Sequence, residues 1–221
     1  MRATVVLAAA VLTHCVFAAE QVNVSICNLG GLKESVVRKA RAETEAVFRP
    51  SKIRIEWSDC DQPSGPRTFI IRLRADKPPH TAGPSSLDAM GRAFLGKDGS
   101  GYLADAYFQS VRELSDLHGA DAAALLGVVI AHELGHLLLG PGHTPNGVMR
   151  SAWGSREMRA VGQRWLKFNR EQRAKMQRML SPQQTRAVPE QTNVNIGSIS
   201  STVARPLLST VSVSKYSHIR R

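Results

Sequence analysis

The sequence of 221 residues has little aromatic content and little cysteine. Phe, Trp and Tyr together make up 5% of the chain, and they are not interleaved with its basic residues as a nucleic-acid stacking surface requires. The turn at residues 98–101 (DGSG) offers one acidic side chain, which is too few oxygen ligands for calcium. We therefore expect no nucleic-acid partner and no calcium loop. The apolar share of 43% is nevertheless enough to bury a core.

Long apolar runs are also few, and neither of the two longest predicts a stable membrane span. Residues 1–18 start with a basic residue, continue with an apolar stretch and reach the small residues Ala18 and Ala19. This is the pattern of a cleaved secretory signal peptide. Residues 121–139 are apolar too, but they are short for a bilayer span and are interrupted by His and Glu. We expect a secreted protein, extracellular or periplasmic.

Cysteine occurs three times, and Cys15 falls within the expected signal peptide. The other two, Cys27 and Cys60, lie at the ends of expected strands. In an oxidising compartment such a pair predicts a disulfide, which would stabilise the fold by about 3–4 kcal/mol in the chain-entropy model. The alternative is a free thiol that caps a metal site and keeps an enzyme latent. We do not favour it, because the segment between the signal peptide and Cys27 is short.

The net charge of +11 is confined to the last third of the chain. Residues 19–149 contain 14 basic and 15 acidic side chains, residues 150–180 contain nine and two, and residues 181–221 contain five and one. One interpretation is weak binding to an acidic surface, such as a cell wall or lipid headgroups. The other, which we favour, is a solvated helix face followed by a soluble tail. Residues 181–221 are rich in Ser, Thr, Gln and Asn without helical periodicity, and we expect them to be mostly disordered.

Alternating and β-branched apolar residues predict a small sheet. The expected strands are residues 22–29, 52–57, 68–74 and 101–109. Residues 75–100 hold many Gly, Pro, Ser and Asp, which predicts a long loop.

Helical spacing of apolar residues predicts helices between and after these strands. The expected helices are residues 33–48, 110–117, 121–139 and one that begins after Asn169. Asp121 is a plausible N-cap, and Asn169 with Gln172 forms a capping-box pattern. A basic amphipathic stretch runs between Trp153 and Phe168. The chain therefore predicts an α+β fold in one domain, residues 19–180, between a signal peptide at 1–18 and a tail at 181–221.

The strongest functional signal is the run HELGHLLLGPGH at residues 132–143. His132 and His136 are four residues apart, so on a helix they lie one turn apart on one face and can bind the same metal ion. Glu133 lies beside them, where a carboxylate can accept a proton from a metal-activated water without being a ligand. The alternative is two ordinary buried histidines that bond to backbone groups. We favour the metal, because two His and a Glu inside an apolar helix are costly to bury without a partner.

A third ligand is expected beyond the helix. Residues 140–142 (Gly-Pro-Gly) end the helix abruptly, so that the chain can turn back and bring His143 to the metal. We favour His143 as the third ligand. Glu157, which lies on an expected helix, is the rival, and His118 is a weaker one; softness and geometry permit either ligand type. Three protein ligands leave a fourth position open for water or substrate, as in catalytic zinc sites.

The run HELGHLLLGPGH followed by GVM resembles the metzincin metallopeptidases, whose motif is HExxHxxGxxH with a Met-turn. The short distance between His143 and Met149 is most similar to the matrix metalloproteinase branch, although this chain has one extra residue in the turn. The resemblance implies that His132, His136 and His143 bind Zn²⁺, that Glu133 is the general base and that Met149 lies beneath the metal. It also implies a small mixed sheet, an active-site helix and a compact C-terminal subdomain with one helix.

These features predict a secreted zinc endopeptidase that acts on peptide or protein substrates as a monomer. By the same resemblance, residues 101–109 would be the edge strand on which an extended peptide pairs; an ordinary strand is the alternative. Two other functions are a zinc-binding or substrate-binding module without catalysis, and a surface-adhesion protein driven by the basic C-terminal region. An intact Glu133 argues against the first, because a non-catalytic site has no chemical need for that carboxylate.

Overall fold

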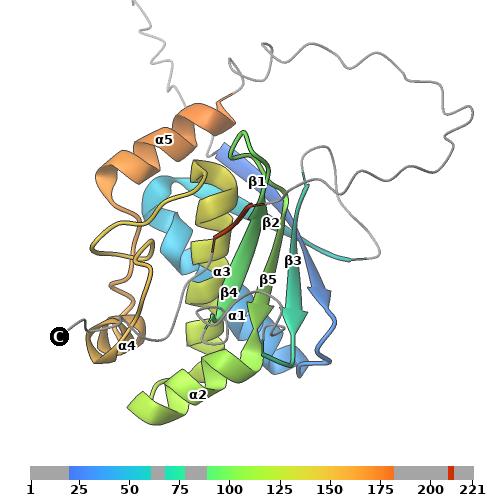
Figure 1. Cartoon of the computed structure of the whole chain (residues 1–221), viewed down its shortest axis with the longest axis vertical. Coiled ribbons are helices and arrows are strands. Elements are labelled where there is room, and N and C mark those ends of the chain that lie inside the picture. Colours follow the sequence, from blue (N-terminus) through green and yellow to red (C-terminus); the bar gives the residue numbers. More distant parts are fainter. Residues whose placement is uncertain (1–19, 61–67, 78–88, 182–208, 212–221) are drawn as a thin grey trace, which may run out of the picture.

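The computed structural model describes residues 20–60, 68–77, 89–181 and 209–211. Within them, a six-stranded sheet has the order β2-β1-β3-β5-β4-β6, and helix α3 lies between this sheet and helices α4 and α5 (Figure 1). The predicted signal peptide at residues 1–18 lies outside the described residues, as does most of the predicted tail. The mixed α+β fold expected from the sequence is confirmed.

The first four strands in sheet order run parallel, and the last two are antiparallel to their neighbours. The strands are Glu20–Asn28 (β1), Ile53–Asp59 (β2), Thr68–Arg74 (β3), Gly91–Leu95 (β4), Leu103–Tyr107 (β5) and Ser209–Val211 (β6). The segments predicted at residues 22–29, 52–57 and 68–74 are therefore strands, as expected.

The helices also begin and end close to where the sequence predicts. They are Glu34–Phe48 (α1), Phe108–His118 (α2), Ala122–Leu139 (α3), Ser155–Gly162 (α4) and Arg170–Leu180 (α5). The side chain of Asp121 accepts a hydrogen bond from the Ala124 N–H at 2.8 Å, which confirms its N-cap role. Asn169 and Gln172 form the predicted capping box at the start of α5. Helix α4 falls within the stretch described above as basic and amphipathic.

Helix α3 runs through the core rather than along the surface. Its length and mean hydropathy of 1.8 would suffice to cross a membrane, but 83% of it is buried inside the fold, which marks a core helix. Gly127 allows α1 to approach closely, because a Cβ atom there would overlap the Ala40 carbonyl oxygen and lie 2.7 Å from Cβ of Glu43. The Thr44 hydroxyl donates to the Gly127 carbonyl at 2.9 Å and fixes this contact.

Two predictions about the sheet are wrong. The segment 75–100 is not a continuous loop, since it contains β4. The glycines and prolines of this segment predict a loop. Strand β4 has only five residues and shows no apolar–polar alternation, because both faces of the strand are largely buried, so its pattern did not reveal it. Residues 101–109 do not form an edge strand, because β5 pairs with β3 on one side and with β4 on the other.

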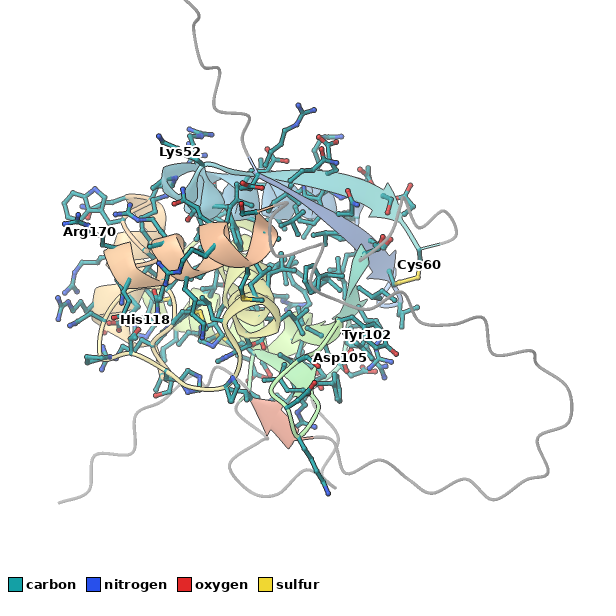
Figure 2. All side chains as sticks on the ribbon, turned by 90° about the horizontal axis from the view of Figure 1, so that it is seen from above. Lys52, Cys60, Tyr102, Asp105, His118 and Arg170 are labelled. Atoms are coloured by element: carbon teal, nitrogen blue, oxygen red, sulfur yellow. A yellow bond between two sulfur atoms is a disulfide. The ribbon has the colours of Figure 1, made fainter. Side chains whose placement is uncertain are left out.

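Residues Ser209–Val211 lie within the segment 181–221 that was predicted to be a tail. These three residues form β6 and pair antiparallel with β4 at the margin of the sheet (Figure 2). Thr210 and Val211 are β-branched residues, which favour strands, and they lie in the sheet because they pair with β4.

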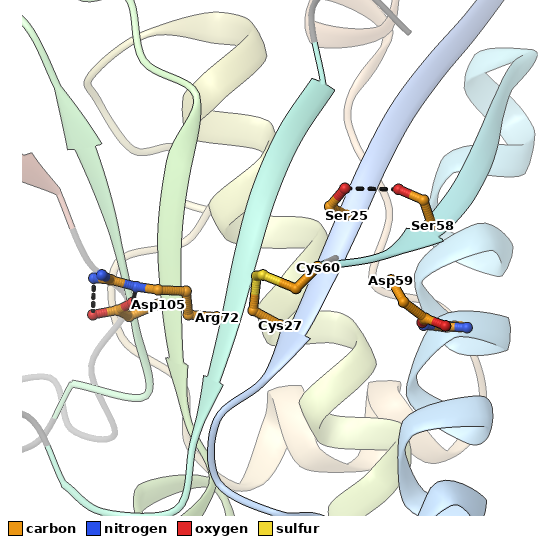
Figure 3. Close-up of a disulfide and its surroundings, with 8 residues drawn as sticks. Ser25, Cys27, Ser58, Asp59, Cys60, Arg72 and Asp105 are labelled. Atoms are coloured by element: carbon orange, nitrogen blue, oxygen red, sulfur yellow. Dashed lines mark hydrogen bonds and ion pairs between the residues drawn. A yellow bond between two sulfur atoms is a disulfide. The ribbon is translucent and has the colours of Figure 1, made fainter. Parts of the chain in front are cut away.

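The predicted disulfide between Cys27 and Cys60 is present (Figure 3). Their Cα atoms are 4.7 Å apart, and the bridge joins the last part of β1 to the end of β2. Close to it, the Ser25 and Ser58 hydroxyls hydrogen-bond across the same two strands at 2.7 Å. The bridge therefore fixes the sheet edge at the side of the molecule opposite Arg170 and α5 (Figure 2).

Candidate metal centre

The structure brings three histidines together at the end of α3. The possible ligand atoms of His132, His136 and His143 all lie within 4.8 Å of one another. The first two side chains come from consecutive turns of α3 and are fully buried, whereas His143 is exposed. The ring centroid of His143 lies 5.3 Å from that of His132 and 4.8 Å from that of His136. Among the described residues, this is the group whose ligand atoms could hold one metal ion.

A turn rich in glycine carries His143 back to the helix. Gly140 has φ +84° and Gly142 has φ +118°, both in the region that favours glycine. The Gly140 N–H still donates to the His136 carbonyl at 2.8 Å, so the last helical turn is closed before the chain reverses at Pro141. The turn thus brings His143 back towards the end of the helix.

Backbone carbonyls orient the two helical imidazoles. Nδ1 of His132 lies 2.7 Å from the Val148 carbonyl oxygen, and Nδ1 of His136 lies 3.3 Å from that of Gly140. A carbonyl only accepts, so each Nδ1 carries the proton, and Nε2 of each neutral ring holds a lone pair. These two Nε2 atoms are 2.9 Å apart. Two lone pairs facing each other repel, and a cation between them offsets that repulsion; the donor set therefore fits a metal ion.

Burial keeps both helical histidines neutral. It lowers the pKa of His132 well below the ordinary value of 6.5, and the neighbouring His136 and His143 lower it further. Burial, with a contribution from His143, also lowers the pKa of His136 to about 4. Neutral imidazole is the form that ligates metals, so neither ring has to lose a proton before binding a metal at neutral pH.

Glu133 is fully buried between α3 and β4. Gly91, the first residue of β4, lies against its carboxylate: a Cβ atom on Gly91 would overlap Oε1 of Glu133 and lie 2.7 Å from its Cγ. Only glycine lets the strand approach this closely. Glu133 is thus held beside the two helical histidines by the strand that faces it.

Met149 lies beneath the helix turn that joins the two helical histidines. A Cβ atom on Gly135 would overlap its Sδ and lie 2.9 Å from the ring of Phe168. Met149 is 1% exposed and follows Val148, whose carbonyl orients His132. A tight turn with Gly147 at φ +80° precedes both residues. The segment 147–149 therefore supplies both an apolar floor and a hydrogen-bond acceptor to the cluster.

The two rival ligands lie outside the histidine cluster. Glu157 accepts hydrogen bonds from the Arg150 guanidinium at 2.5 Å and from the Gly154 N–H at 3.0 Å. It therefore ties the chain after Met149 to the start of α4. Nδ1 of His118 lies 3.4 Å from the Ser155 hydroxyl. The structure thus brings His143, and neither rival, to the helical pair.

Sequence reasoning missed three neighbours of the cluster. Trp153 is 1% exposed, and its ring lies edge-on to His132 with centroids 5.8 Å apart. Its proximity to Met149 in the sequence could have suggested this contact. Gly91 was assigned to a loop, and the Val148 carbonyl belongs to the backbone, so neither carried a signal in the residue types.

No protein-family model matches the chain, and no curated protein matches its sequence. Solved structures that resemble the fold include an archaemetzincin from Methanopyrus kandleri and metalloproteinase-II from Bacteroides fragilis. The first has 16% identity and a TM-score of 0.49, and the match covers 75% of this chain and 98% of that one. The second has 12% identity and a TM-score of 0.46, and the match covers 73% of this chain but 53% of that one. At these identities and TM-scores, neither similarity carries a function to this chain.

Proposed function

We propose that this protein is a secreted zinc-dependent endopeptidase. The convergence of His132, His136 and His143 next to the buried carboxylate of Glu133 is the observation that carries the proposal. A purely structural zinc site is normally closed by four protein ligands, whereas three leave a position for water or substrate. An adjacent carboxylate outside the ligand set has a role in hydrolysis and none in simple metal retention.

Zinc is the proposed metal because three neutral imidazoles form a typical catalytic zinc ligand set. When bound, zinc polarises the scissile carbonyl and lowers the pKa of water at the site. The Val148 and Gly140 carbonyls keep Nε2 of the two helical histidines unprotonated and aimed at the metal. Such outer hydrogen bonds commonly change metal affinity by about 10–100-fold.

Glu133 is proposed as the general base. It accepts a proton from the water that attacks the peptide carbonyl, and it then returns the proton to the leaving amine as the C–N bond breaks. Its burial removes competing water, and the contact with Gly91 restricts its rotation. A fixed carboxylate loses little freedom when it takes part in the reaction.

Secretion and a peptide substrate complete the proposal. The disulfide between Cys27 and Cys60 supports an oxidising compartment, in agreement with the signal peptide predicted at residues 1–18. We also propose that the mature chain acts as a monomer. Strand β4 contacts Glu133 through Gly91, so an extended substrate would pair with β4 rather than with residues 101–109, which the sequence suggested.

The variant Glu133→Gln tests the mechanism, with Glu171→Gln on the exposed surface of α5 as its control. Zinc content of the purified mature chain and hydrolysis of unstructured casein, with and without a chelator, are measured together. We expect Glu133→Gln to bind zinc in the wild-type ratio and to lose about 10²–10⁴-fold in hydrolysis. Wild-type hydrolysis by this variant rejects the role of Glu133. Zinc binding without chelator-sensitive hydrolysis in the wild type favours the non-catalytic module instead.

A further inference from the structure

The short strand β6 occupies the outer edge of β4. Ser209, Thr210 and Val211 pair antiparallel with Leu95, Phe94 and Ala93, in that order. The other edge of β4 pairs with β5. A strand has only two edges that can form a hydrogen-bond ladder, so both edges of β4 are filled at Ala93 and Phe94.

The edge that β6 covers belongs to the strand beside the histidine cluster. At its start, Gly91 lies against the carboxylate of Glu133. Near its end, a Cβ atom on Gly101 would lie 2.8 Å from Cδ2 of Leu95 and 3.1 Å from Cδ2 of Leu137. Strand β4 thus runs along α3 from the level of Glu133 to that of Leu137, and this stretch of the helix includes His136.

The residues of β6 have the chemistry of a generic extended peptide. Ser209 and Thr210 are small and uncharged, and Val211 is a half-buried side chain that packs against the hydrophobic core. Pairing through backbone groups depends little on sequence. The same edge that accepts this segment would therefore accept many other extended peptides.

We propose that residues 209–211 act as an internal competitor that occupies the peptide-binding edge of β4 and so restrains the enzyme. This inference rests on the proposed endopeptidase function. A substrate must displace β6 before it can pair with β4. The KM is therefore raised by a factor equal to the inverse of the fraction of molecules in which the outer edge of β4 is free. Once the substrate is bound, the zinc ligands and Glu133 are unchanged, so kcat is unaffected.

Because β6 belongs to the same chain as β4, even a weak pairing between them is effective. Three residues form few hydrogen bonds, and a separate peptide of that length would bind poorly. Within one chain, however, β6 is always present beside β4 at a fixed effective concentration, which a separate peptide does not have. A substrate below that concentration competes poorly for the edge, whereas loss of the β6–β4 pairing opens it.

The test uses the full chain with Ser209→Pro, Thr210→Pro and Val211→Pro together, which removes all three N–H groups from β6. Thr210→Val, which keeps both the N–H and the strand preference, is the matched control. Val211→Asp is a second disrupting variant that leaves every N–H in place and replaces the packed apolar side chain with a charged one. Far-UV circular dichroism and the thermal midpoint check that each variant keeps the wild-type fold.

Binding is measured first, because it does not depend on catalysis. The probe is a fluorescein-labelled peptide of residues 205–215, followed by fluorescence anisotropy; a peptide with prolines at positions 209–211 is its control. We expect the labelled peptide to bind the triple-proline chain on the order of 10-fold more tightly than the wild-type chain. The proline peptide should bind neither chain. Equal affinity of the labelled peptide for the two chains overturns the inference.

Hydrolysis of a peptide substrate is measured second. We expect the triple-proline and Val211→Asp chains to have a KM on the order of 10-fold lower than the wild type, with the same kcat, and Thr210→Val to match the wild type. If the probe binds as expected but no chain hydrolyses peptides, the endopeptidase proposal fails and the docking of residues 209–211 on β4 stands. If hydrolysis occurs but neither KM nor probe binding changes, the competitor role fails alone.

Discussion

The two halves of the histidine cluster are built differently. His132, Glu133 and His136 lie on one buried helix, and Asp121 caps the N-terminal end of that helix. His143 is exposed and reaches the others through a turn with two glycines in left-handed conformations. The helical half is fixed by regular backbone geometry and by surrounding core residues, whereas His143 depends on one turn. We therefore expect the helical half to be the more preorganised of the two.

The largest expected effect is the loss of zinc affinity when one histidine is removed from either half of the cluster. Loss of a hydrogen-bond partner of a metal ligand weakens metal binding by roughly 10–100-fold. We expect His136→Ala and His143→Ala, which remove a ligand itself, each to weaken zinc binding by more than this. His136→Ala should be the worse of the two, because it also removes one of the two preorganised nitrogens. Competition with a chromophoric chelator measures both affinities, and His118→Ala, outside the cluster, is the control. A larger loss of zinc affinity in His143→Ala than in His136→Ala would contradict the expectation that the helical half is preorganised.

The next effect concerns how β4 holds Glu133. Gly91→Val places a side chain where the Glu133 carboxylate lies, so the carboxylate has to move while the histidines stay. We expect zinc binding to persist and hydrolysis to fall on the order of 10²-fold, the cost of an ångström-scale misplacement of a reacting group. Gly154→Ala, which meets no neighbouring atom within 4 Å, is the matched control. Unchanged hydrolysis in Gly91→Val would mean that Glu133 is not positioned by this contact.

A smaller effect is expected where Met149 supports the helical half. Gly135→Ala forces the new methyl group against Met149 and Phe168, and overpacking of this kind costs about 1–3 kcal/mol of stability. Urea denaturation of the chelator-treated protein measures the free energy of unfolding without a contribution from zinc. Gly162→Ala on α4, where a Cβ meets open space, should leave that free energy unchanged or raise it. An equal free energy of unfolding for Gly135→Ala and Gly162→Ala would show that Met149 does not pack tightly against α3 at Gly135.

The smallest effect lies at the start of α3. Asp121→Ala removes the N-cap and should cost on the order of 1 kcal/mol, whereas Asp121→Asn keeps the cap and should cost less. The hydrogen bond from Lys39 holds the pKa of Asp121 below its ordinary value of 3.8. Its charged form therefore stabilises the fold above pH 3.8, and this contribution is lost as the pH falls through the lower folded pKa. Urea denaturation at pH 7 and at pH 3 should show the gap between wild type and Asp121→Asn narrowing at the lower pH.

Much of the helical half was predictable from sequence because it depends on local geometry. A spacing of four residues places His132 and His136 on one face of any helix. The apolar run from residue 121 to residue 139 predicted helix α3 and its burial, and Asp121 predicted where the helix begins. The Gly-Pro-Gly turn indicated that the chain reverses before His143. The sequence favoured His143 over its rival Glu157, and the structure adds the reason why Glu157 lies elsewhere, namely its hydrogen bonds to Arg150 and Gly154.

The sequence by itself determined the α+β class, the order of the main helices, the disulfide pair and the two helical histidines of the candidate metal centre. These follow from periodicity, capping residues and side-chain chemistry, which act over short stretches of chain. Only the tertiary structure decided that β4 lies within a segment of loop-like composition, that Gly91 faces Glu133, and that residues 209–211 cover β4. Each of these depends on which segments, distant in the sequence, lie side by side in the fold, and short-range periodicity and capping patterns carry no information on that arrangement.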